Sequence, residues 1–156
     1  MATSINKVKS RESSMVGARP SRGTTWQRLA VVGASLTIVA TIADVAVAMA
    51  LRSWLHVPAG FQPLTTPAVV SVTIVAMIAA TVVFAWTART QADPVRKFLK
   101  IATVGLVLSW LPELAIWVTA VFHDTTTGGI LSLMALHVVA AGCAVAILTR
   151  FGLRSE

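Results

Sequence analysis

Four long apolar stretches dominate the chain, at residues 29–51, 68–88, 98–120 and 129–149. Each contains 21 to 23 residues, and an α-helix of about 20 residues spans the roughly 30 Å hydrocarbon core of a bilayer. The connectors between them, of 16, 9 and 8 residues, are too short to hold a separate soluble domain. The pattern therefore predicts an all-α integral membrane protein, a bundle of four transmembrane helices.

Turn-forming residues support these boundaries. Pro67 is well placed to start the second helix, and Asp93 with Pro94 is expected to end the second helix and begin the third. A cleavable signal peptide is an alternative interpretation of the first stretch. That stretch is long for a signal sequence and is interrupted by Asp44, so we expect it to be a transmembrane helix.

The composition agrees with this fold and indicates which segments lie outside the helices. Of the 156 residues 56% are hydrophobic and 12% are charged, and the charges concentrate outside the four stretches. We therefore predict one transmembrane domain at residues 29–149, followed by a short cytoplasmic tail at 150–156. Residues 1–28 are rich in Ser, Thr, Gly and basic side chains, which predicts a disordered basic tail.

The basic residues predict an orientation. If the four stretches alternate in direction, twelve of the thirteen Lys and Arg residues fall on one side, and Arg52 is the exception. The positive-inside rule then places both termini in the cytoplasm (N-in/C-in), in a bacterial cytoplasmic (inner) membrane. A basic face that contacts acidic lipid explains the net charge of +7 without a nucleic-acid partner.

Three ionisable residues lie inside the apolar stretches: Asp44, Glu113 and His137. A charged side chain at the centre of a transmembrane helix costs about 2.5–3.5 kcal/mol, so such residues usually face protein or water. At 1.5 Å per residue, Asp44 and Glu113 lie about 24 Å from the cytoplasmic end and His137 about 20 Å. We predict that these three form one polar pocket with Ser109, beside a helix kink at Pro112.

This pocket allows three interpretations. It can be a set of structural hydrogen bonds between helices, with Arg52 as another partner for Asp44. It can be a proton-coupled transport or ligand-binding site, because burial moves the titration of carboxyl and imidazole groups toward neutral pH. It can also hold a Ser109–His137 dyad for acyl chemistry. The chain has no G-x-S-x-G and no H-E-x-x-H motif, so we predict that it is not an enzyme.

No cofactor or metal ion is predicted. Cys143 is the single cysteine, which excludes an intramolecular disulfide and the four-helix thiol oxidoreductases that need paired cysteines. A di-haem cytochrome needs paired histidines, and only His137 lies in a predicted helix. His56, His123 and Asp124 lack the spacing of metal ligands.

Two segments carry a family resemblance: L-S-L-M-A-L-H-V-V-A-A at 131–141 and L-S-W-L-P at 108–112. Both resemble a family of small actinobacterial four-helix membrane proteins, a domain of unknown function, over residues 26–150. Ser109, Pro112 and His137 match that pattern, whereas Glu113 departs from it. The resemblance implies the four-helix architecture and a membrane location, and no activity.

We therefore predict a non-enzymatic polytopic inner-membrane protein that acts as an accessory or interaction subunit. The expected partners are acidic lipid, a second copy of the chain or a larger membrane protein. The alternative is a small proton-coupled transporter or ligand-binding protein that uses the Asp44, Glu113 and His137 pocket.

Overall fold

The computed structural model describes residues 26–153, which form four long helices and one short 3₁₀ helix. In chain order these are α2 (Trp26–Trp54), η1 (Gln62–Leu64), α3 (Thr66–Thr90), α4 (Pro94–Thr119) and α5 (Thr127–Phe151). That part of the chain contains no strand. All four long helices are long and apolar enough to cross a membrane, which confirms the predicted all-α, four-helix transmembrane fold.

The helices extend past the apolar stretches at every end except the C-terminal end of α4, which stops at Thr119. The predicted N-terminal tail at 1–28 overlaps the structure only at 26–28, which belong to α2; residues 1–25 and 154–156 lie outside the described residues. The guanidinium of Arg89 lies 3.2 Å from the centre of the Trp26 ring, a cation–π contact that stabilises this first turn. α4 starts at Pro94, as the Asp93–Pro94 pair predicts and ahead of the apolar stretch that begins at 98, because the Asp93 side chain accepts a hydrogen bond from the backbone N–H of Arg96.

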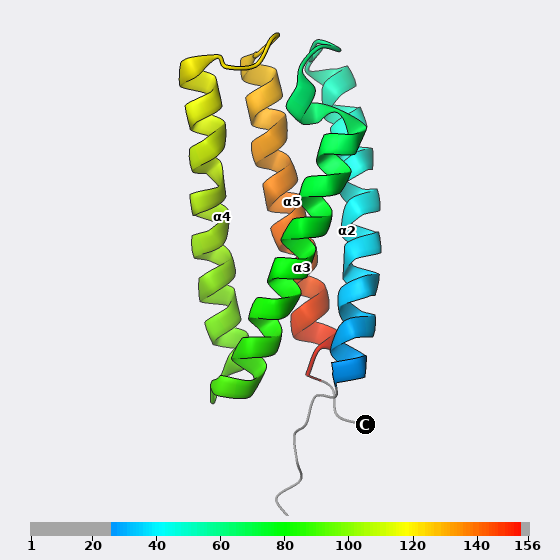
Figure 1. Cartoon of the computed structure of the whole chain (residues 1–156), viewed down its shortest axis with the longest axis vertical. Coiled ribbons are helices and arrows are strands. Elements are labelled where there is room, and N and C mark those ends of the chain that lie inside the picture. The colour runs from blue at the N-terminus through cyan, green and yellow to red at the C-terminus, as the bar shows by residue number, and fades with distance from the viewer. Residues whose placement is uncertain (1–25, 154–156) are drawn as a thin grey trace, which may run out of the picture.

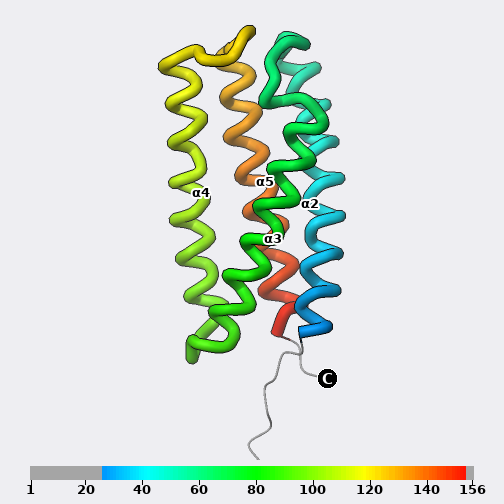
Figure 2. Tube along the Cα trace, in the orientation of Figure 1, coloured from blue at the N-terminus to red at the C-terminus, as the bar shows by residue number. Residues whose placement is uncertain are grey.

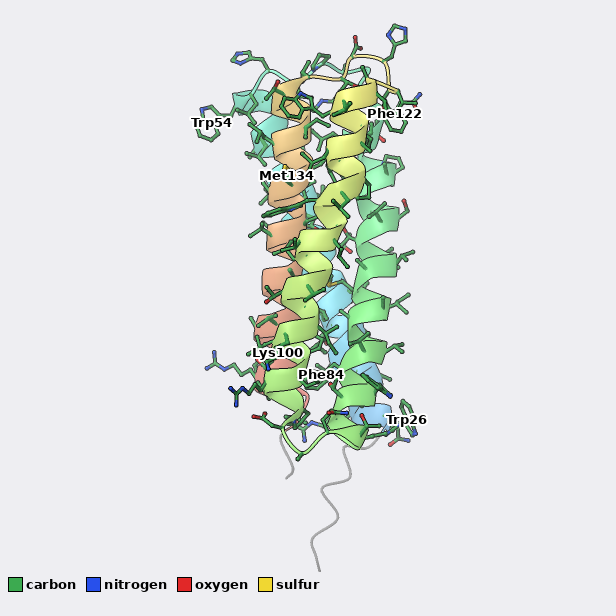
Figure 3. All side chains as sticks on the ribbon, turned by 90° about the vertical axis from the view of Figure 1, so that its left-hand side faces the viewer. Trp26, Trp54, Phe84, Lys100, Phe122 and Met134 are labelled. Atoms are coloured by element: carbon green, nitrogen blue, oxygen red, sulfur yellow. The ribbon has the colours of Figure 1, made fainter. Side chains whose placement is uncertain are left out.

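The four helices run alternately up and down the bundle (Figure 1). α2 packs against both α3 and α5, and α4 packs against α5 and, less extensively, against α3. Figure 2 traces the start of α2 and the end of α5 to the same end of the bundle. We name the two ends after Trp26 and Trp54, which Figure 3 shows at opposite ends of the molecule.

Two apolar clusters hold the bundle together. The cluster near the Trp26 end contains Phe84 of α3 and Phe98 of α4, whose rings meet edge to face with centroids 5.1 Å apart. The cluster near the Trp54 end is built around Phe61 and Leu64 of the α2–α3 connection, together with Leu133 and Leu136 of α5. Asp44 of α2 and Thr73 of α3 lie between the residues that their helices contribute to the two clusters.

Candidate functional site

A cavity of about 380 Å³ lies between α3 and α4, in the half of the bundle nearer the Trp54 end. In Figure 1 α3 and α4 meet near the Trp26 end and diverge toward this half, with α5 behind them. The apolar lining residues are Pro63, Ala68, Val69, Val72, Ala76, Pro112, Ile116, Leu133, Leu136 and Ala140. The polar lining residues are Asp44, Thr73, Ser109, Glu113 and His137. Pockets that are mostly apolar with a few convergent polar groups are typical of small-molecule sites.

All four helices contribute a polar side chain to this cavity. Asp44 comes from α2, Ser109 and Glu113 from α4, and His137 from α5. Asp44, Glu113 and His137, which the sequence places at a similar depth, therefore line the same space together with Ser109. Asp44 and Glu113 are almost fully buried, with 2% and 6% of their surface exposed.

The side chain of Asp44 is bound from α3. Thr73 donates its hydroxyl proton to Asp44 Oδ2 at 2.8 Å, and both residues are buried. Asp44 Oδ1 has no hydrogen-bond partner within the described residues. Arg52, the alternative partner, instead lines a separate small pocket with Leu64 and Thr66.

Glu113 and His137 form the second polar pair. His137 Nδ1 lies 3.6 Å from Glu113 Oε1, close enough for an ion pair, and 2.9 Å from the backbone oxygen of Leu133. A carbonyl oxygen can only accept, so this contact places the ring proton on Nδ1 and leaves Nε2 as an acceptor in the neutral ring. The second carboxyl oxygen of Glu113, Oε2, has no partner in the part of the chain that the structure describes.

Ser109 lies on the cavity wall but does not form a dyad with His137. Its hydroxyl donates to the backbone oxygen of Leu106 at 2.7 Å, and no hydrogen bond joins it to His137 in the range 26–153. Pro112 lies on the same wall within α4, which stays helical from Pro94 to Thr119. A kink at Pro112 stays a prediction.

Thr73 is the site residue that the sequence reasoning missed. Val69, Thr73 and Met77 follow one another at four-residue spacing, and all three are buried on one face of α3. A threonine in such a buried stripe needs a hydrogen-bond partner. The four-residue spacing therefore could have identified Thr73 as a residue of the polar pocket.

The histidines of the connections do not join the site. His56 lies between α2 and η1, and His123 and Asp124 lie between α4 and α5. Across residues 26–153 no three side chains of His, Cys, Asp or Glu are grouped so that they could hold a metal ion.

A family model covers residues 20–154, a range that includes the whole described bundle. The chain belongs to DUF6069, a family of unknown function. This membership confirms the predicted assignment to an uncharacterised domain family, and the match reaches further toward the N-terminus than the predicted 26–150. No curated protein and no solved structure matches the chain.

Proposed function

We propose that this family member is a non-enzymatic, multi-pass protein of a bacterial cytoplasmic membrane that binds a small lipophilic molecule in the cavity between α3 and α4. One observation carries the proposal. Two buried carboxyl groups line a largely apolar cavity, and each of them leaves one oxygen without a hydrogen-bond partner among the described residues.

These free oxygens favour ligand binding over a purely structural role. Buried polar groups that only tie helices together are normally satisfied, and each unsatisfied one costs about 1–3 kcal/mol. The volume of about 380 Å³ also falls within the range of small-molecule pockets, roughly 300–1,000 Å³. A bound molecule could fill this volume and supply the missing partners.

A closed Trp26 end supports binding rather than conduction through the bundle. Leu29, Phe84, Phe98 and Leu148 are all almost fully buried in the cluster at that end. Their side chains pack together between the helices at that end, and this apolar packing favours binding over conduction.

The test is saturable binding of ten-carbon probes to the purified protein in phosphatidylcholine nanodiscs. Tritiated decanol, decylamine and decanoate are titrated against wild type and against Ala76→Phe, which places a large ring on the cavity wall. The matched control is Val75→Phe, because Val75 is 67% exposed, lies next to Ala76 and does not line the cavity. Saturable binding of at least one probe that Ala76→Phe weakens and Val75→Phe leaves unchanged supports the proposal. Absence of saturable binding of all three overturns it.

The proposal that the protein is not an enzyme has its own test. The hydroxyl proton of Ser109 is directed to the backbone oxygen of Leu106, and within residues 26–153 no hydrogen bond joins Ser109 to His137, which supports this proposal. We expect a fluorophosphonate probe to label wild type no more than Ser109→Ala. Labelling that disappears in Ser109→Ala would support the hydrolase interpretation instead.

A second candidate function, an accessory subunit, is favoured by the exposure of α4. Of all residues in α4 only Phe98 and Glu113 are buried, so most of its apolar surface is free to pack against another membrane protein or a second copy. Light scattering of the detergent-extracted native protein tests this candidate. A protein mass above the 16.5 kDa of one chain supports it, and a monomer argues against it.

A further inference from the structure

The cavity is closed along the bundle axis and opens sideways between α3 and α4. Phe61 and Leu64 are buried at the Trp54 end, and the Phe84–Phe98 contact joins α3 to α4 at the other end. Val72, on the cavity wall, is 59% exposed, and Figure 1 shows α3 and α4 diverging in this half. A ligand therefore reaches the cavity from the hydrocarbon core of the membrane, and it must itself be lipophilic.

The charged groups on the walls are acidic. α2 contributes Asp44 and α4 contributes Glu113, the imidazole of His137 faces them from α5, and α3 contributes only the neutral hydroxyl of Thr73. Among the described residues no Lys or Arg lines the cavity. An anionic ligand would therefore face two acidic side chains without a permanent positive charge to balance it.

The hydrogen bonds around the cavity also indicate which ligand chemistry it fits. The protons of the Thr73 hydroxyl, the Ser109 hydroxyl and His137 Nδ1 are already directed to Asp44, to Leu106 and to Leu133. What remains are two carboxyl oxygens without a partner among the described residues, Asp44 Oδ1 and Glu113 Oε2. A complementary ligand must supply hydrogen-bond donors.

We propose, resting on the binding function above, that the ligand is a lipophilic primary amine without a phosphate group. Its ammonium carries three N–H donors and one positive charge, which match the free carboxyl oxygens of Asp44 and Glu113. Its apolar body occupies the part of the cavity lined by Val72, Ile116 and Leu136. An amine-bearing phospholipid shares the ammonium chemistry, but its phosphate would meet no basic residue on these walls.

The experiment compares the head groups of the three ten-carbon probes on wild type. We expect decylamine to bind at least about tenfold more tightly than decanol, because a hydrogen bond to a charged group is stronger than a neutral one. Decanoate is expected to bind most weakly. Equal affinities, or tighter binding of decanol or decanoate, overturn the amine assignment while the proposed binding function stands. Loss of saturable binding for all three probes overturns both.

Carboxyl-to-amide variants test whether Asp44 and Glu113 bind the amine. Glu113→Gln and Asp44→Asn should each weaken decylamine binding about tenfold or more and leave decanol binding within about threefold. The matched control is Asp93→Asn, the same chemical change at the cap of α4, where asparagine caps equally well. Unchanged decylamine affinity in both cavity variants overturns the proposal. If Glu113→Gln does not fold, the amine assignment is still tested by Asp44→Asn and by the order of affinities that wild type shows for the three probes.

A change of lipid distinguishes a free amine from an amine-bearing lipid. The decylamine titration is repeated in nanodiscs in which phosphatidylethanolamine replaces half of the phosphatidylcholine. An unchanged affinity supports the phosphate-free amine. A lowered apparent affinity shows competition by the lipid head group and overturns that assignment.

Discussion

Hydroxyl groups on these helices mostly donate to the backbone of their own helix, as Thr37 does to Gly33 and Thr81 to Met77. Thr73 differs, because its hydroxyl reaches across to the carboxyl of Asp44 on α2. In an apolar surrounding a buried carboxyl without donors is costly, so this bond both links two helices and lowers the cost of burying Asp44. At the residue scale Thr73 is thus the main protein partner of the site's most buried acid.

Replacing Thr73 with Val should destabilise the bundle by about 1–2 kcal/mol, because the shape is kept while Asp44 loses its only hydrogen-bond donor among the described residues. Thr73→Ser keeps the hydroxyl and should cost less. Unfolding of the detergent-purified protein measures both free energies. Equal losses in the two variants would mean that the methyl group, and not the hydrogen bond, matters at this position.

At the scale of the elements, glycines on different helices differ in how closely a neighbouring helix approaches them. A Cβ atom added to Gly33 of α2 would lie 2.7 Å from Thr81 Cγ2 of α3, which shows how closely these two helices pack. A Cβ added to Gly105 of α4 would meet nothing within 4 Å. The close pair α2–α3 and the loosely packed α4 together explain why the cavity opens beside α4.

Gly33→Ala should therefore lower stability by about 1–3 kcal/mol, because a methyl group forced into a packed helix contact displaces its neighbours. Gly105→Ala is the matched control and should be close to neutral. Thermal unfolding in detergent compares the two variants. A neutral effect of Gly33→Ala would mean that α2 and α3 can move apart without loss.

At the scale of the whole molecule the charges are strongly asymmetric. Six of the seven described basic residues lie at the Trp26 end, and Arg52 alone lies toward the Trp54 end. The six are Arg28, Arg89, Arg96, Lys97, Lys100 and Arg150. By the positive-inside rule this supports the prediction that both termini, and with them the Trp26 end, face the cytoplasm and acidic lipid.

Cysteine labelling tests that orientation. In a Cys143→Ser background, an impermeant maleimide should label His123→Cys on intact cells but label Ala92→Cys only after the membrane is opened. Both positions are exposed, in the connections at opposite ends of the bundle. The reverse labelling pattern would mean that the bundle is inserted the other way round.

The four helices and the membrane fold were predictable from the sequence because they depend on the hydropathy and length of each segment. The thickness of the hydrocarbon core sets both requirements, whatever the other segments do. The shared depth of Asp44, Glu113 and His137 followed from the same counting along each helix. The tertiary structure, through the rotation of each helix about its axis and its packing against its neighbours, decided which side chains meet. It paired Thr73 with Asp44, brought His137 beside Glu113, and left a cavity between α3 and α4. These contacts join residues far apart in the chain, and they depend on side-chain fit between helices, which no single apolar stretch encodes.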